Sequence, residues 1–329
     1  MAVWEYANAL ARRGHEVHVV HDTILGEPVE SLDDVTWFEF DERLHHHFGA
    51  PEDLDGHRSD FVFCLFRAAP AELGLPLMWV QAIDAFPPFV EKTIFGATCP
   101  KLCTSTFIRD VVIDRGVDPR QAVHLPYGIR HDKYRVTRAL DDRPPAVAML
   151  YNPHEMKGPA VGLAAIVAAK QRVPELEAHV FGVGPRPDLP DWIDYVQDPP
   201  QAQLVDQIYN GSRIFVLPSR VEGFGLAAVE AMASGCALVS TDCGGSNDYA
   251  HHGDTALVSP PGDVDAMADH LVSLLLDDQA RCEMSARSVA FVQRFDWDRS
   301  AEQLETFLTT YADDPAVLQQ PAELVPWPE

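Results

Sequence analysis

The sequence lacks any apolar run long enough to span a bilayer, although 47% of its 329 residues are hydrophobic. A transmembrane helix needs about 20 consecutive apolar residues, so we expect a protein that folds around its own cores in water. No basic, apolar leader opens the sequence, and we therefore expect no export and a cytoplasmic location. A chain of this length has room for about two domains.

Positive charge is also scarce. The 25 Lys and Arg residues are outnumbered by 50 Asp and Glu, which gives a net charge of −25. A nucleic-acid partner needs a basic face, so this balance argues against one. It also disfavours tight electrostatic docking on anionic lipid. The surplus of carboxylates is expected mainly to keep the protein soluble.

Cysteine is sparse and never follows the spacing of a zinc site. We expect all six cysteines to be reduced thiols. The run His45-His46-His47 could bind a metal ion, but we interpret it as a solvated loop. The sequence therefore predicts no metal site.

What the sequence does contain is a dense series of structural signals at residues 213–249. An apolar run at 214–217, closed by Pro218, predicts a buried parallel strand. A polar, glycine-rich turn follows, and residues 226–234 are nearly all good helix formers. A second apolar run at 237–239 leads to a pair of glycines. This order directs a helix N-terminus and backbone N–H groups at a phosphate.

Two carboxylates bracket the glycine-rich turn. Glu222 precedes the expected helix, and Glu230 lies inside it among small and apolar residues, where a charge needs a partner. Their separation (230 − 222 = 8 residues) corresponds to about 12 Å of helical rise. The paired carboxylates of a retaining glycosidase lie only about 5 Å apart. Two separate roles fit better, with one Glu at a reacting sugar and the other on a ribose.

This stretch resembles the E-x7-E signature of the family 4 retaining glycosyltransferases, also called group 1 glycosyl transferases. The matching segments are Glu222-Gly-Phe-Gly-Leu, Glu230-Ala-Met-Ala-x-Gly and Gly244-Gly245, with Pro218-Ser219-Arg220 in front. The resemblance implies the GT-B fold, an α/β arrangement of two Rossmann-like parallel-sheet domains facing a cleft. The alternative is a βαβ unit of some other nucleotide-binding protein.

The resemblance also implies an activity. The implied enzyme is a metal-independent hexosyltransferase of polysaccharide or glycoconjugate synthesis. It moves a hexosyl group from a nucleotide diphosphate sugar to an acceptor hydroxyl. By resemblance, Glu222 holds the donor sugar and favours its positive charge, while Glu230 accepts hydrogen bonds from ribose hydroxyls. Four backbone N–H groups suit the departing diphosphate, those of Gly223, Phe224, Gly225 and Leu226.

Other candidate residues lie outside the signature. The family usually places an Arg and a Lys in the turn at 152–158 to hold the diphosphate. Lys157 matches the Lys, although it could be an ordinary surface lysine, whereas Asn152 stands roughly where the Arg would be. Arg220 is a further candidate for the phosphate. In the first domain, Asp84 is our candidate for contacting sugar or acceptor, and a loop-capping Asp is an equally good interpretation.

Three Asp-x-Asp pairs superficially match the metal-binding motif of the other large glycosyltransferase class. They lie at 53–55, 263–265 and 296–298. The last two fall at expected helix starts, where Asp caps N–H groups, and the first falls in a loop rich in Pro and Gly. We therefore expect neither a metal nor another cofactor.

The order of apolar runs predicts the domain organisation. We expect an acceptor-side domain at 1–140 and a nucleotide-sugar-binding domain at 141–296. A helix at 297–312 is expected to cross back to the first domain, and a loose tail to occupy 313–329. The charged segment 137–145, which ends in two prolines, is expected to be the linker.

The sequence opens on a helical pattern at 3–13, and strands are expected at 16–21, 36–40, 61–65 and 77–80. A parallel fold that opens on a helix has lost the strand that should precede it. The family normally begins with that strand and a glycine-rich loop. We therefore expect the first domain to lack its N-terminal strand, and this chain to bind nucleotide while transferring sugar poorly.

The expected partners are a nucleotide diphosphate sugar and a saccharide or glycolipid acceptor. A lipid acceptor would bring peripheral membrane association. Two alternatives remain open: a nucleotide-sugar epimerase on the same scaffold, and a nucleotide-sugar binding protein without turnover.

Overall fold

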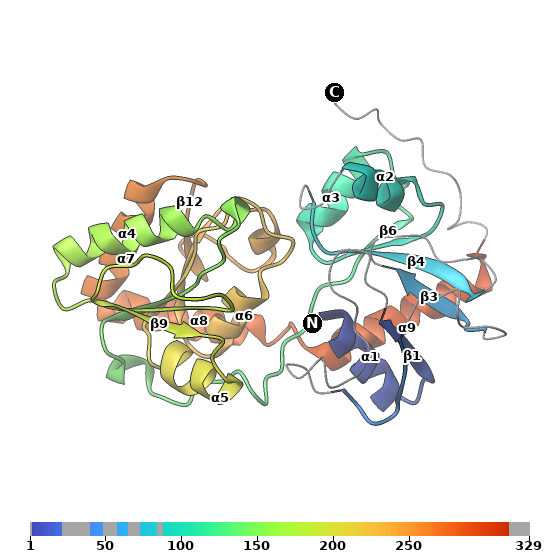
Figure 1. The fold of residues 1–329 in the computed structure, drawn as a ribbon, viewed down its shortest axis with the longest axis horizontal. Coiled ribbons are helices and arrows are strands. Elements are labelled where there is room, and N and C mark those ends of the chain that lie inside the picture. The colour runs from blue at the N-terminus through green and yellow to red at the C-terminus, as the bar shows by residue number, and fades with distance from the viewer. Residues whose placement is uncertain (1, 22–39, 49–57, 65–72, 84–87, 316–329) are drawn as a thin grey trace. The chain divides into compact units, whose positions relative to one another are not determined.

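The computed structural model describes residues 2–21, 40–48, 58–64, 73–83 and 88–315. The chain forms two compact units, and the C-terminal segment belongs to the first of them (Figure 1). The units comprise residues 1–128 with 297–329, and residues 129–296. None of the helices described is both long and apolar enough to cross a membrane.

The second unit is built on a parallel sheet of six strands in the order β12-β11-β10-β7-β8-β9. The strands are β7 (Ala146–Leu150), β8 (Glu177–Gly182), β9 (Ile193–Gln197), β10 (Ile214–Leu217), β11 (Ala237–Thr241) and β12 (Ala256–Ser259). Counted in chain order, this is the 3-2-1-4-5-6 arrangement of a Rossmann sheet. β10 and β11 are buried along their whole length, as expected for apolar runs in the middle of a parallel sheet.

Helices cover this sheet. The longer ones are α4 (Pro159–Arg172), α6 (Leu226–Ala233), α7 (Val264–Leu276) and α8 (Asp278–Val292). The shorter ones are η4 (Leu140–Asp142), η5 (Glu155–Lys157), α5 (Gln201–Gln203), η6 (Leu204–Tyr209) and η7 (Gly245–Asp248). α4 packs along α7, and α6 packs against α8 (Figure 1). Ile166 of α4, Leu271 of α7 and Val147 of β7 belong to the main core, and all three are fully buried.

Several local predictions for this unit are confirmed. The strand at 214–217 and the helix after the glycine turn are β10 and α6. Asp263 caps α7, because its Oδ1 accepts a hydrogen bond from the backbone N–H of Ala266 at 3.0 Å. A short polar side chain at this position satisfies an N–H group that the helix leaves unpaired.

Residues 129–145 are part of the second unit, and the interpretation of 137–145 as a linker is wrong. The unit begins at Ile129, before the predicted boundary at 140. Asn210 Oδ1 accepts a hydrogen bond from Thr137 N at 2.8 Å, and Arg143 is only 2% exposed. Its guanidinium donates to the carbonyl oxygens of Tyr209 and Ser212. These contacts fix a segment whose charge and prolines suggested a free connection.

The first unit contains two parallel sheets among its described residues. One pairs β1 (Val17–His21) with β2 (Leu44–Phe48). The other has the order β3-β4-β5-β6, with β3 (Phe61–Cys64), β4 (Leu75–Val80), β5 (Lys101–Cys103) and β6 (Ala122–His124). The helices are α1 (Ala2–Arg12), α2 (Pro88–Gly96), α3 (Thr106–Asp114) and α9 (Trp297–Asp313).

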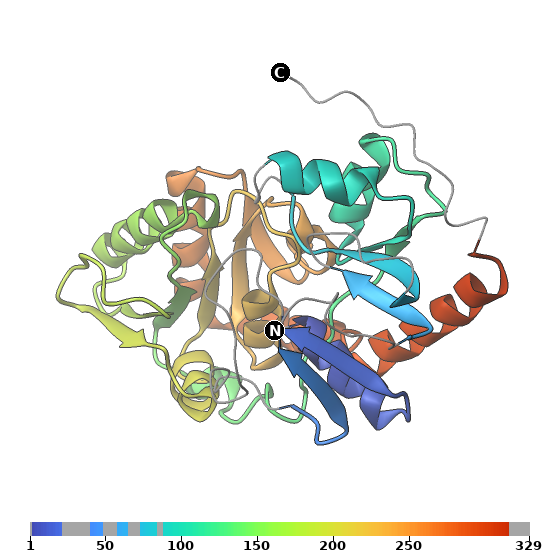
Figure 2. The same cartoon turned by 45° about the vertical axis from the view of Figure 1, so that its right-hand side comes forward.

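The last helix, α9, belongs to the first unit. It packs against α1, which in turn packs against β1 and β2 (Figure 2). Tyr6 of α1 lies edge-on to Trp297, and Tyr311 donates a hydrogen bond to the carbonyl oxygen of Pro76 at 3.2 Å. Most of the expected tail, from 316 onward, lies outside the described residues, as do residues 36–39 of the strand expected at 36–40.

The interpretation of His45-His46-His47 as a solvated loop is wrong. All three residues lie in β2, which pairs in parallel with β1 in the register His18 to His45 and Val20 to His47. Histidine favours neither strand nor loop strongly, so these residues carry little local signal for either conformation. The pairing with the apolar strand β1 decides the conformation.

Candidate active site

The candidate site lies at the carboxyl ends of β7 and β10. These neighbouring strands are paired in parallel. The next strand in the chain lies on opposite sides of the pair, since β8 is beyond β7 and β11 is beyond β10. Ligands of open α/β sheets bind at such a topological switch point, outside the carboxyl ends of the strands. Lys157 follows β7 and Glu222 follows β10, so the fold brings both predicted residues to this edge.

Lys157 and Glu222 form an ion pair. The distance from Lys157 Nζ to Glu222 Oε2 is 2.8 Å, and the lysine side chain is 39% exposed while the glutamate side chain is 10% exposed. The second carboxylate oxygen, Oε1, accepts a hydrogen bond from Ser219 Oγ at 2.7 Å. A carboxylate this buried needs such partners. The site therefore holds the Glu222 side chain in one orientation, beside a cation that solvent can reach.

The two turns that carry these residues are packed directly against each other. Arg220 N donates to the carbonyl oxygen of Met156 at 2.7 Å. Gly158 has a left-handed φ of 61°, and a Cβ there would come closer than 3.0 Å to the carbonyl oxygen of Pro218. Only glycine accommodates both the conformation and the contact. Lys157 is thus positioned by the β10 turn as well as by its own.

Glycines bring a third segment, after β11, against Glu222. Glu222 N donates to Cys243 O at 2.8 Å, and Gly245 N donates to Glu222 O at 3.0 Å. A Cβ on Gly245 would come closer than 3.0 Å to the backbone of Gly223. The backbone of Glu222 is therefore fixed on both sides. Gly245 is required for close approach, whereas Gly244 has a positive φ of 81°.

Helix α6 begins at the same place. Gly225 is left-handed, with φ 93°, and Leu226 starts the helix. The hydroxyl group of Tyr249 donates to the carbonyl oxygen of Phe224 at 2.8 Å, and burial raises the pKa of Tyr249 well above its usual value. The neutral Tyr249 phenol therefore holds the turn before α6 in place through this hydrogen bond. Ala228 N donates to Gly225 O at 3.0 Å, and the N–H groups before it, at the helix N-terminus, carry a partial positive charge suited to an anion.

Glu230 occupies the middle of α6 and is half-buried. Its charge lies close enough to Tyr209 to raise the pKa of that phenol, after burial, which is the larger cause. The Glu230 carboxylate therefore lies near Tyr209 of η6. The two glutamates have different surroundings, in keeping with the two roles expected from the sequence.

The remaining predicted residues are less constrained. Asn152 is exposed, and its Oδ1 accepts a hydrogen bond from His154 N at 2.9 Å, which closes the turn after β7. Arg220 has an exposed side chain on the turn before Glu222. Asp84 lies outside the described residues. These three assignments stay predictions.

Sequence reasoning missed the residues that position the site. Ser219 was noted only as part of the motif, although it orients Glu222, and Tyr249 and Arg143 were not considered. Arg143 donates to Ser234 O at 2.6 Å and so satisfies a carbonyl group at the end of α6. A serine three residues before the glutamate, inside a strand–turn–helix motif, was the one local signal. The other two contacts depend on tertiary structure.

Residues 145–277 match a family model described as Glycosyl transferases group 1. The O-antigen chain mannosyltransferase B of Escherichia coli is 37% identical over 112 residues, which are 34% of this chain and 29% of that protein. The phosphatidyl-myo-inositol mannosyltransferase of Mycolicibacterium smegmatis is 30% identical over 198 residues, which are 56% of this chain and 50% of that protein. The matches thus span half or less of the length of these curated relatives.

Solved structures extend the similarity in fold to nearly the whole chain. Sucrose-phosphate synthase from Thermosynechococcus elongatus has a TM-score of 0.73 at 18% identity, over 95% of this chain and 93% of its own. HepE of Anabaena, in complex with UDP-glucose, has a TM-score of 0.64 at 17% identity, over 72% of each chain. These neighbours confirm an α/β, GT-B-type architecture. Residues 145–277 of this chain are a domain of the group 1 glycosyl transferase family.

Proposed function

We propose that this protein transfers a hexosyl group, with retention of configuration, from a nucleotide diphosphate sugar to a hydroxyl group of a saccharide or glycolipid. The observation that carries the proposal is the Lys157–Glu222 ion pair at the switch point of the Rossmann sheet. It places one cation and one oriented carboxylate beside the N-terminus of α6, where a diphosphate and its sugar would need them.

Donor binding would divide this ion pair. The diphosphate is the stronger anion, so Lys157 Nζ moves to it, and its 39% exposure leaves the side chain free to do so. The N–H groups at the start of α6 add fixed dipoles, worth about 0.3–2 kcal/mol. Together these groups stabilise the charge that builds on the departing diphosphate. Arg220, on the adjacent turn, is proposed to contribute a second cation.

Glu222 would then face the sugar alone. As the bond between the anomeric carbon and the diphosphate oxygen breaks, the electron pair leaves with the nucleotide diphosphate and the sugar becomes positively charged. The carboxylate, held by Ser219, stabilises this charge. The acceptor oxygen forms the new bond on the same face and passes its proton to an oxygen of the leaving phosphate. Atoms and charge balance without a redox partner.

Glu230 is proposed to bind the ribose. The proposed phosphate-binding turn leads into α6, and Glu230 lies four residues after Leu226, the first residue of that helix, near Tyr209. A ribose attached to the diphosphate would extend in this direction along the helix. The carboxylate would accept hydrogen bonds from the hydroxyl groups, as acidic residues do in other Rossmann folds.

Relatives support the sugar class of the donor. Two curated relatives are named as mannosyltransferases, and a structural neighbour was solved with UDP-glucose. A hexose is common to these names, and the ligand of the structural neighbour carries it on a nucleotide diphosphate. We therefore propose a nucleotide diphosphate hexose as donor, with the base and the hexose to be identified by experiment.

A screen of donors tests this proposal. The protein is heated with a panel of UDP-, GDP- and ADP-hexoses, because a ligand that binds only the native state raises Tm by mass action. A donor that raises Tm is then incubated with saccharide acceptors, and nucleotide release is followed. Binding with transfer supports the proposal. Binding without any nucleotide release would favour a binding protein, and release of an epimerised nucleotide sugar would favour an epimerase.

A further inference from the structure

A separate cluster of chemistry-bearing side chains lies in the first unit, on one face of the β1–β2 pair. His18 of β1 is paired in register with His45 of β2, and Val20 is paired with His47. Side chains alternate between the faces of a strand, so Glu16 and His18 share a face, as do His45 and His47. Because paired residues of adjacent strands point to the same side, these four residues lie together.

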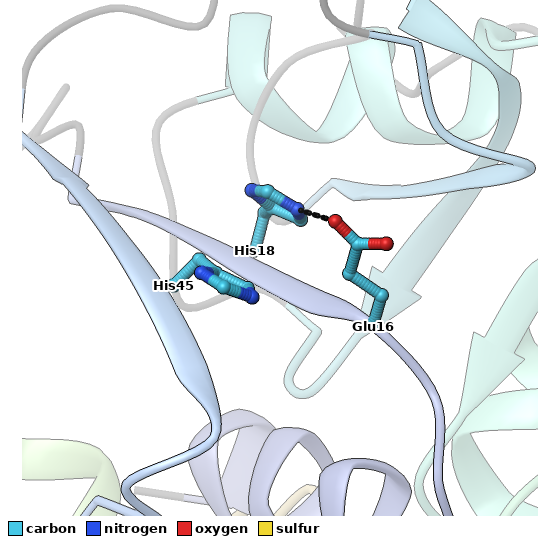
Figure 3. A group of neighbouring side chains, drawn as sticks. All are labelled: Glu16, His18 and His45. Atoms are coloured by element: carbon cyan, nitrogen blue, oxygen red, sulfur yellow. Dashed lines mark hydrogen bonds and ion pairs between the residues drawn. The ribbon is translucent and has the colours of Figure 1, made fainter.

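Three of these side chains bring their ligand atoms into one small volume. Glu16 Oε1 lies 3.1 Å from His18 Nε2, and the rings of His18 and His45 are stacked with centroids 4.7 Å apart. One ligand atom from each of Glu16, His18 and His45 lies within 4.8 Å of the other two (Figure 3). Among the described residues, no other group of three His, Cys, Asp or Glu side chains is arranged this closely.

His47 also contacts the ring of His18. His18 Nδ1 and His47 Nε2 are 2.8 Å apart, and the two rings are stacked. A metal-bound histidine commonly donates its second ring N–H to a neighbour, which fixes the tautomer and the ring. With Nδ1–H donated to His47, His18 Nε2 carries the lone pair, and this atom lies 3.1 Å from Glu16 Oε1.

The third histidine of the run lies on the opposite face. His46 packs edge-on against Phe40, with ring centroids 4.6 Å apart, and burial lowers its pKa. The neighbouring residues on that face, Val17, Val19 and Leu44, belong to the apolar cluster with α1. The alternation of side chains along β2 thus places His45 and His47 on the face of Glu16 and His18, and His46 on the opposite face.

We propose that Glu16, His18 and His45 bind a late first-row divalent metal ion, with Zn²⁺ as the best match to two imidazoles and one carboxylate. Tetrahedral zinc has metal–ligand distances of about 2.0–2.2 Å, which place its ligand atoms about 3.3 Å apart. Glu16 and His18 already meet this spacing. His45 is exposed, so its side chain can close the remaining distance, and water would fill the fourth position.

The ion would join β1 to β2. A two-stranded sheet is only marginally stable by itself, and a metal ion with ligands from both strands would hold their register. An exposed Glu–His ion pair, the alternative explanation of Glu16 and His18, contributes little to stability. This site lies in the first unit and shares no residue with the proposed donor site, so its test is independent of sugar transfer.

Zinc binding by the full chain tests the proposal. Zn²⁺ is titrated against a chromogenic chelator, and Co²⁺ serves as a spectroscopic probe whose absorption reports tetrahedral coordination. We expect one Zn²⁺ per chain and a rise in Tm with added Zn²⁺. His18→Gln and His45→Gln should weaken binding by at least about 100-fold, and His47→Gln by about 10–100-fold, the usual effect of losing a supporting contact.

His46→Gln is the matched control, because it removes a histidine of the same run from the other face. It should leave zinc affinity within about twofold of the wild type, because the His46 ring packs against Phe40 on the opposite face of the strand from the proposed ligands and from His47. Circular dichroism checks that every variant is folded, and a variant that fails this check is replaced by the corresponding Asn substitution. The proposal is overturned if the wild type binds no Zn²⁺ at micromolar concentration, or if His46→Gln weakens binding as much as His45→Gln.

Discussion

Lys157 Nζ lies 2.8 Å from Glu222 Oε2, although these residues are 65 positions apart (222 − 157) and follow different strands. The pair is asymmetric, since the carboxylate is nearly buried and the ammonium group is partly exposed. A buried charge whose partner can be drawn away by a stronger anion is suited to a binding step. The following predictions rest on this relationship and on the turns that create it.

The two glutamates should have different kinetic roles. Glu222→Gln should lower kcat, because the carboxylate acts on a charge that exists only in the transition state. Glu230→Gln should chiefly raise KM for the donor, since ribose contacts persist through the reaction. Steady-state kinetics with varied donor measures both. Indistinguishable kinetic signatures would contradict the division of roles.

Ser219→Ala should impair Glu222 without removing it. The variant loses the 2.7 Å hydrogen bond to Oε1, and a buried acceptor left unsatisfied costs about 1–3 kcal/mol. We expect a lower kcat and a lower free energy of unfolding in urea. Ser273→Ala, which removes a hydroxyl group from an exposed position on α7, is the control and should change neither. Wild-type turnover in Ser219→Ala would show that the serine does not orient the carboxylate.

Lys157→Met should raise KM for the donor and lower kcat, whereas Lys157→Arg should retain part of the activity. The diphosphate loses a direct cation in the first variant only. Arg172→Met provides the control, because it breaks an exposed ion pair with Asp269 far along α4. Donor affinity can be followed by calorimetry with the nucleotide diphosphate. Unchanged affinity in Lys157→Met would identify an ordinary surface lysine.

Alanine substitutions at two glycines with similar backbone conformations can distinguish backbone strain from steric crowding. Gly225 and Gly253 have φ of 93° and 81°, but only a Cβ on Gly225 would meet a neighbour, the hydroxyl group of Tyr249. Gly253→Ala should cost about 1–2 kcal/mol through its conformation, and Gly225→Ala about 1–3 kcal/mol more through overpacking. Urea unfolding measures both. Equal costs would mean that Tyr249 does not press on the turn.

Sugar transfer should not require a metal ion at the donor site. Among the described residues, the one close group of potential metal ligands contains neither Glu222 nor Glu230. Activity at 25 °C should therefore survive excess chelator. A loss that manganese restores and simple salt does not restore would contradict this prediction.

The sequence predicted the second unit better than the first for a physical reason. In β10 and α6, apolar runs, helix formers and obligatory glycines all indicate one structure, so residues 214–233 could be assigned from local signals. Arg143 and His45 show where such signals fail. Arg143 lies in a charged, proline-rich segment, yet its side chain is buried and donates hydrogen bonds to carbonyl groups that are distant in sequence. His45 takes its strand conformation from β1.

The candidate site divides in the same way. Lys157, Glu222 and the glycines of the turn could be identified because their residue types are dictated by charge and by backbone geometry. Their mutual contact, and its support by Ser219 and Tyr249, could not be predicted. These contacts depend on which strands are neighbours, and strand order is a property of the whole sheet.

Nucleotide release and product configuration test the central claim most directly. The protein is incubated with the nucleotide diphosphate hexose that raises its Tm and with an acceptor, and the product is examined by NMR spectroscopy. We expect the nucleotide diphosphate to be released, the anomeric configuration of the donor to be kept, and Glu222→Gln to slow release on the order of 100-fold. An inverted product, or release that is unaffected in Glu222→Gln, would contradict the account.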